Sequence, residues 1–175
     1  MPSSSPPEAF FAPCPRGLEA LLAKELADFG ALEVRAAAGG VGFAGSWETC
    51  YRANLWSRLA SRVLWRVGEF EYASEDDIYA AARAVNWFDL FDVNRTLRVY
   101  VTAQNSPVKS LEFVTLRVKD AVCDRFRDDV GRRPDVDRAA PDVRVHVFLE
   151  EKRGVLYLDT SGEGLFKRGW RKDTV

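Results

Sequence analysis

The sequence has few of the residues that build metal sites and disulfide frameworks. Its 175 residues include one histidine, His146, and three cysteines, Cys14, Cys50 and Cys123. The cysteines are odd in number and far apart, and no pair has the CxxC spacing. This pattern argues against a zinc site and against a structural disulfide framework, so we expect no metal and a reducing, cytoplasmic setting.

Long apolar runs and a strong net charge are also missing. No stretch approaches the roughly 18 apolar residues of a membrane-spanning helix, so we expect no membrane partner. The first residues, MPSSSPP, have neither the basic start nor the apolar core of a signal peptide, and we expect a disordered tail over 1–8. The net charge of −1 creates no global positive field, so any anion binding would depend on a local basic patch.

Residues 9–73 show the order strand, helix, strand, strand, helix, strand. Pro15 and Gly30 bound an amphipathic helix, and alternation on both sides of Gly39-Gly40 predicts a hairpin. Ser46 can cap the second helix. We expect this helix to face inward through Trp47, Tyr51, Leu55 and Leu59. The order of elements predicts a ferredoxin-like βαββαβ subdomain.

Residues 74–165 predict a second α/β layer, which makes the whole chain an α+β protein. Ser74 and Asp77 are spaced for a capping box, and Ser110 can cap a long helix over 111–130. Residues 143–149 alternate strictly between apolar and other side chains, and they turn back into a strand over 155–160.

No pattern in the sequence predicts catalysis. His146 lies in the strand over 143–149 on the parity of Arg144 and Phe148, and general-base catalysis would need a partner within reach. The glycine-rich stretch over 39–42 lies in a hairpin and opens no helix, so it is no dinucleotide fingerprint, and no P-loop is present. We expect no catalytic residue, no metal ligand and no cofactor bound by this chain.

The stretch over 158–172, LDTSGEGLFKRGWRK, is the strongest candidate binding site. From 161 to 172 it has four basic residues, Lys167, Arg168, Arg171 and Lys172, against the single acid Glu163. Phe166 and Trp170 lie among these charges. Cations bind a phosphate backbone and aromatic rings stack on bases, so the pattern favours RNA binding. The alternative is a solvated connector whose two aromatic side chains pack into a core.

A second candidate lies at the start of the long helix. Over 105–119, the basic residues Lys109, Arg117 and Lys119 are opposed only by Glu112. Free backbone N–H groups and the helix dipole favour a phosphate close to Lys109 and Ser110. The alternative is that Lys109 is a loop lysine and that Arg117 and Lys119 are ordinary surface charges.

Four separated motifs resemble those of a known family. They are Cys14-Pro15-Arg16-Gly17-Leu18-Glu19, the stretch YRANLWSRLASR over 51–62, Lys119-Asp120-Ala121, and LDTSGE over 158–163 followed by Lys167-Arg168-Gly169. Together they resemble the N-terminal part of the bacterial 23S ribosomal RNA guanine-N2 methyltransferases of the large-subunit K/L type, which carry a THUMP domain. The resemblance covers nearly all of residues 9–172.

The resemblance implies a ferredoxin-like subdomain over 9–73, a THUMP domain that captures RNA over 74–165, and the start of a linker over 166–175. In this family a Rossmann-like domain then transfers methyl groups from S-adenosylmethionine. The chain has neither a glycine-rich S-adenosylmethionine loop nor an Asn/Asp-Pro-Pro-Tyr/Phe motif. We therefore expect an RNA-binding module that captures 23S ribosomal RNA for a methyltransferase domain outside this sequence.

Two other functions stay open. The chain could be a structural module that packs on its own methyltransferase domain, or the THUMP module of a tRNA-modifying enzyme such as a thiolation enzyme. For RNA binding we expect recognition of shape and backbone, because the sequence has no motif typical of single-strand recognition.

Overall fold

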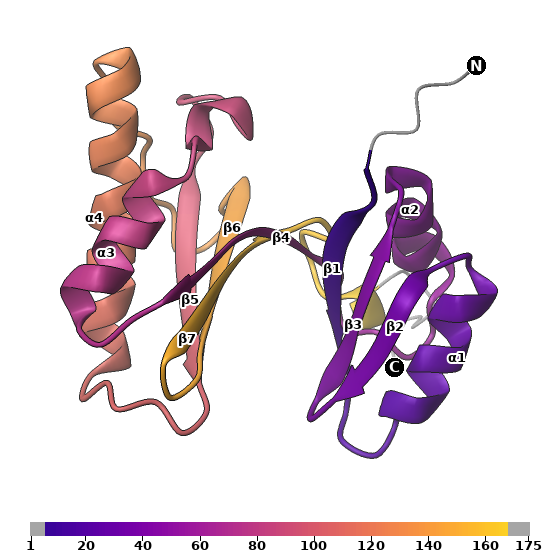
Figure 1. Cartoon of the computed structure of the whole chain (residues 1–175). Coiled ribbons are helices and arrows are strands. Elements are labelled where there is room, and N and C mark those ends of the chain that lie inside the picture. Colours follow the sequence, from indigo (N-terminus) through magenta and orange to yellow (C-terminus); the bar gives the residue numbers. More distant parts are fainter. Residues whose placement is uncertain (1–5, 168–175) are drawn as a thin grey trace, which may run out of the picture. The chain divides into compact units, whose positions relative to one another are not determined.

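The computed structural model describes residues 6–167 (Figure 1). They form two compact units. The first contains the chain up to Arg66 and resumes at Asp159, and the second is Val67–Leu158. The chain therefore leaves the first unit, builds the second, and returns to the first.

The first unit is ferredoxin-like. Its elements are β1 (Glu8–Pro13), α1 (Glu19–Asp28), β2 (Leu32–Ala37), β3 (Gly40–Gly45), α2 (Trp47–Trp56), the start of β4 (Leu64–Glu71) and the short 3-10 helix η2 (Leu165–Lys167). The strands lie in the order β2-β3-β1-β4. All of their pairings are antiparallel. The predicted βαββαβ order is confirmed.

Local signals explain how these elements begin. The Ser46 side-chain oxygen accepts a hydrogen bond from the Thr49 N–H and caps α2. The Glu19 carboxylate accepts from the Gly17 and Gly39 N–H groups at 2.8 and 3.0 Å, which ties the start of α1 to the β2–β3 turn. The hydrogen bond from its own backbone N–H, together with those from Gly39 and Gly17, lowers the pKa of Glu19, because these bonds stabilise the ionised carboxylate.

The predicted inward face of α2 is wrong for Tyr51 and Leu55. Trp47 does contact the Phe10 and Trp65 rings, and Leu59 packs against the core after the helix has ended. The helix buries Thr49, Cys50 and Ala53 instead. Its large side chains are exposed, Tyr51 to 60% and Leu55 to 68%. The helix carries two apolar stripes, and the small side chains face the sheet because they allow the helix to pack closely against it.

The second unit is an α/β layer. Its elements are α3 (Glu75–Ala84), the 3-10 helix η1 (Trp87–Asp89), β5 (Leu97–Ala103), α4 (Leu111–Val130), β6 (Val143–Leu149) and β7 (Arg153–Asp159). The strand order is β4-β7-β6-β5. The β5–β6 pair is parallel and the β6–β7 pair is antiparallel. Helices α3 and α4 lie together on one side of these strands (Figure 1).

The helix boundaries of the second unit follow the predicted caps. Ser74 and Asp77 form the capping box, with the Ser74 hydroxyl accepting from the Asp77 N–H and the Asp77 carboxylate accepting from the Ser74 N–H. Ser110 accepts from the Phe113 N–H and caps α4. The apolar stripe of α4 packs on the sheet, with Val114, Val118 and other members buried.

Candidate nucleic-acid interface

The segment that follows β7 is fixed to the first unit by a polar network around Asn54. The Asn54 amide donates to Thr160 Oγ1 at 3.0 Å and to the Cys50 carbonyl at 3.1 Å. Ser161 Oγ donates to Asn54 Oδ1 at 2.6 Å and accepts from the Val63 N–H at 2.8 Å. Thr160 Oγ1 donates to the Val63 carbonyl at 2.8 Å. These hydrogen bonds of Asn54, Thr160 and Ser161, which we call the anchor, fix the start of the predicted basic segment to the first unit.

An ion pair strengthens this anchor. The Asp159 side chain is fully buried and pairs with Arg62, whose side chain is 26% exposed. A buried carboxylate without its cation would be strongly unfavourable, so Arg62 has a structural role.

A hollow of about 400 Å³ lies beside the anchor in the first unit. Its lining residues are Tyr51, Asn54, Leu55, Thr160, Ser161, Glu163, Gly164, Leu165 and Lys167. Lys167 is exposed at this hollow, and the neighbouring Phe166 is 76% exposed rather than packed in a core. The other predicted members of this patch, Arg168, Arg171 and Lys172, lie outside the described residues, as does Trp170.

The structure does not bring Lys109, Arg117 and Lys119 together in one patch. Arg117 pairs with Asp76 of α3 at 2.6 Å, and its guanidinium lies 4.3 Å from the centre of the Tyr79 ring. Lys119 pairs with Asp120 at 2.6 Å. Two residues along a helix correspond to a turn of about 200°, so Arg117 and Lys119 point in different directions. Lys109 is exposed in the loop before α4.

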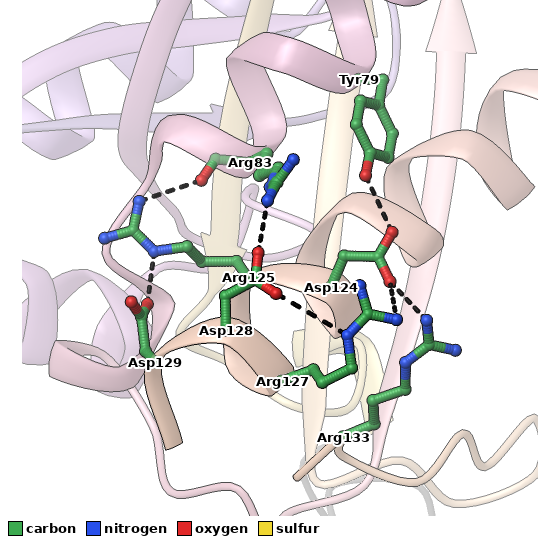
Figure 2. Close-up of polar contacts among 8 residues, drawn as sticks. All are labelled: Tyr79, Arg83, Asp124, Arg125, Arg127, Asp128, Asp129 and Arg133. Carbon is green, nitrogen blue, oxygen red and sulfur yellow. Dashed lines mark hydrogen bonds and ion pairs between the residues drawn. The ribbon is translucent and has the colours of Figure 1, made fainter. Parts of the chain in front are cut away.

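Most arginines between α3 and α4 are used within the protein (Figure 2). Arg83 pairs with Asp128, Arg125 with Asp129, and Arg133 with Asp124. Arg127 lies 3.3 Å from Asp124 and 3.7 Å from Asp128. The Arg83–Asp128 pair joins α3 to α4, and the other pairs lie within α4 or between α4 and the loop that follows it. Each of these arginines has a carboxylate partner, which makes it a poor candidate for a phosphate contact.

The pKa shifts of Asp124 and Tyr79 also indicate that these charged groups interact with one another inside the protein. Burial raises the pKa of Asp124, but the hydrogen bond from Tyr79 and the charges of Arg127 and Arg133 outweigh it, so the pKa is lowered overall. The hydrogen bond to Asp124 raises the pKa of Tyr79. Both shifts favour the forms that the hydrogen bond between them requires, the ionised Asp124 carboxylate and the protonated Tyr79 hydroxyl.

A cationic and aromatic face on β5 and β6 was missed by the sequence analysis. The strands pair in parallel with Arg98 opposite Arg144, Tyr100 opposite His146 and Thr102 opposite Phe148. The side chains between them in sequence, such as Val99 and Val145, are buried on the side of the helices. The alternation of Arg144, His146 and Phe148 was visible in the sequence, but their partners on β5 are known only from the strand register.

The aromatic side chains of this face form an ordered column. The Tyr100 and His146 rings are stacked, with centres 4.9 Å apart and an angle of 14° between their planes. The Arg98 guanidinium lies 4.7 Å from the centre of the Tyr100 ring, and it also donates a hydrogen bond to the Arg138 carbonyl. Neither Arg98 nor Arg144 forms an ion pair with a carboxylate of residues 6–167.

Within the described part of the chain, no group of three or more His, Cys, Asp or Glu side chains could hold a metal ion. Cys14, Cys50 and Cys123 are buried free thiols, and burial raises the pKa of each. Across residues 6–167, no helix has the length and apolar character needed to cross a membrane.

Two family models match the chain. The RlmL ferredoxin-like domain model matches residues 9–64 and the THUMP domain model matches residues 72–159. Each match falls mainly on one of the two units.

The matching relatives are named as ribosomal RNA large subunit methyltransferases K/L. The chain is 45% identical over 169 residues to the protein of Syntrophotalea carbinolica, covering 97% of this chain and 24% of that protein. It is 44% identical over 161 residues to the protein of Pseudomonas aeruginosa, covering 92% of this chain and 22% of that protein. The chain thus spans about a quarter of the length of these relatives.

A solved structure with the same fold is described as a predicted N6-adenine-specific DNA methylase from Listeria monocytogenes. It has a TM-score of 0.84 and 30% sequence identity, and the match covers 97% of this chain and 44% of that chain.

Proposed function

We propose, from the finding that this chain belongs to the THUMP domain family, that it is the part of a 23S ribosomal RNA methyltransferase that captures the RNA. The observation that carries the proposal is the pair of adjoining matches, to the RlmL ferredoxin-like domain and to the THUMP domain. The identity of 44–45% to the K/L methyltransferases over more than nine tenths of the chain supports the same function. THUMP domains bind RNA, and the named relatives act on ribosomal RNA.

In this proposal, another part of a longer protein carries out the methyl transfer. The relatives are about four times as long as the matched region, which leaves room for a methyltransferase domain that uses S-adenosylmethionine. This chain would bind and position the RNA, and its own methyltransferase domain would transfer the methyl group. Such a protein would act in the cytoplasm, where ribosomal RNA is located.

The proposed phosphate contacts are the predicted basic residues, namely Lys109, Arg117, Lys119, Lys167, Arg168, Arg171 and Lys172. Lys109 and Lys167 have the strongest support, because both are exposed and neither forms an ion pair with a carboxylate of residues 6–167. Arg117 and Lys119 would have to exchange an internal carboxylate for a phosphate.

Titration of the chain with a labelled hairpin of 23S ribosomal RNA tests this function. Lys167→Ala and Lys109→Ala should each weaken binding several-fold, and by similar factors for different RNA sequences, because phosphate contacts carry no sequence information. Lys24→Ala is the matched control, since Lys24 is an exposed lysine of α1 that pairs with Asp28 at 3.0 Å. If both variants bind like the control, these two lysines are not the contacts.

A second function, docking on the methyltransferase domain, is favoured by one observation. Tyr51, Leu55 and Phe166 are large apolar side chains that remain mostly exposed in the first unit. Exposed apolar surface of this kind is typical of protein contacts. A docking module would associate with a separately supplied methyltransferase domain, and Leu55→Ser would weaken that association without changing the affinity for the RNA hairpin.

A further inference from the structure

The face of β5 and β6 that is turned away from α3 and α4 combines cations and stacked rings. We propose that this face binds an unpaired RNA nucleotide, whose base stacks on the Arg98 guanidinium while Arg144 holds a neighbouring phosphate. The proposal rests on the proposed RNA-binding function and names the part of the RNA that this surface takes. It differs from recognition of shape and backbone alone, which the sequence favoured.

The first argument is the order of the column. The Tyr100 ring contacts both neighbours, with 4.9 Å between its centre and that of the His146 ring and 4.7 Å to the Arg98 guanidinium carbon. The Arg98 guanidinium is the planar cation of this group. Bases stack on guanidinium planes as they do on aromatic rings, so a base would extend the column by one further plane.

The second argument is preorganisation. The Arg98 guanidinium donates to the Arg138 carbonyl and contacts the Tyr100 ring, so two contacts limit its rotation before any ligand arrives. A side chain that is already ordered loses less conformational entropy on binding. Arg98 and Tyr100 are half-buried, which leaves part of each accessible.

The third argument is charge. Arg98 and Arg144 lie directly opposite each other on neighbouring strands. Like charges in such positions destabilise a sheet. Neither has a carboxylate partner among residues 6–167, in contrast to the paired arginines between α3 and α4. A phosphate held by Arg144 would relieve this repulsion.

The test compares the full chain with Arg98→Lys, which keeps the charge and removes the planar group. Binding is measured by fluorescence anisotropy with a single-stranded RNA decamer and with a blunt RNA duplex of the same sequence. We expect Arg98→Lys to weaken single-strand binding about tenfold, because stacking of one base contributes roughly that factor, and to change duplex binding less than about twofold. Arg83→Lys, a paired arginine of the same unit, is the matched control and should change neither affinity.

Arg144→Gln is the second variant, and it should weaken binding of the single strand several-fold through loss of the phosphate contact. Thermal melting of each variant verifies that it is folded. Wild-type single-strand affinity in Arg98→Lys would overturn the proposal, and so would an equal loss for single strand and duplex. If the wild-type chain binds the 23S hairpin in either of these cases, the proposed function stands and only the assignment of this face fails. Absence of binding to every RNA would instead refute the proposed function.

Discussion

Replacement of Asn54 by leucine should release the segment that follows β7 from the first unit. In the folded protein the Asn54 amide donates to Thr160 Oγ1 and accepts from Ser161 Oγ. After the replacement Ser161 Oγ keeps the Val63 N–H, and Thr160 Oγ1 keeps the Val63 carbonyl and the Cys50 thiol at 3.5 Å. Each hydroxyl therefore loses its hydrogen bond with the Asn54 amide in a half-buried place.

The expected cost is worked out from the bonds to Thr160 and Ser161; the replacement also removes the bond from the Asn54 amide to the Cys50 carbonyl within α2. A hydrogen bond of this kind contributes about 1–1.5 kcal/mol, so Asn54→Leu should lower the free energy of unfolding by about 2–3 kcal/mol. Urea denaturation monitored by circular dichroism measures this change. Gln104→Leu is the matched control, because Gln104 is exposed and its side-chain amide forms no hydrogen bond with residues 6–167, and its effect should stay within about 0.5 kcal/mol.

A double-mutant cycle with Ser161→Ala isolates the contact between the two side chains. If Asn54 and Ser161 act through their 2.6 Å hydrogen bond, the two losses will not add, and the coupling energy should be about 1 kcal/mol. A loss below about 0.5 kcal/mol in Asn54→Leu, or additive losses in the cycle, would refute the reasoning that this network anchors the segment.

Two other changes test the fold. Gly40→Ala should destabilise the first unit, because a Cβ there would lie 2.5 Å from the Phe11 ring and 2.7 Å from the Ala12 carbonyl oxygen. Gly42→Ala should be tolerated, because the nearest atom to its Cβ would be 3.9 Å away. Equal melting temperatures for the two variants would contradict this reasoning. Hydrogen bonds from the Ala73 N–H and from Ser74 lower the pKa of Asp77, so its contribution to stability is present above its unfolded pKa of about 3.9 and is lost as the pH falls through the lower folded value. The stability difference between wild type and Asp77→Ala should therefore be largest near neutral pH and shrink below about pH 4, and a difference independent of pH would show that the carboxylate does not act through its charge.

The sequence was sufficient to predict most of the elements, because their boundaries depend on local chemistry. Ser46, Ser74 and Ser110 each cap the predicted helix by accepting from the N–H three residues later. The long helix spans Leu111–Val130 and the alternating strand spans Val143–Leu149, as predicted. Hydrogen-bonding caps and strict alternation both act within a few residues, so one sequence is enough to find them.

The orientation of α2 could not be predicted in the same way. Both of its stripes are apolar, one with large side chains such as Tyr51 and Leu55 and one with the small Cys50 and Ala53. A count of large apolar residues selects the first stripe, but the sheet packs against the second. The choice depends on the distance between helix and sheet, which periodicity does not contain.

The candidate binding surfaces depend on partners that are distant in the sequence. Arg117 meets Asp76 from another helix, and Arg98 meets Arg144 across two strands. A basic residue can be identified from the sequence, but its net charge in the folded protein depends on which carboxylates the fold brings close to it. For this reason the opposed arginines of β5 and β6, which have no carboxylate partner among residues 6–167, were identified only from the strand register.

The salt dependence of RNA binding by this chain tests its central role most directly. Contacts to a few phosphates release counterions, so the affinity for a 23S ribosomal RNA hairpin should fall at least about tenfold between about 50 and 200 mM salt. Saturable binding at the lower salt with this decrease would agree with an RNA-capturing module. No saturable binding at about 50 mM salt, or an affinity that does not depend on salt, would contradict it.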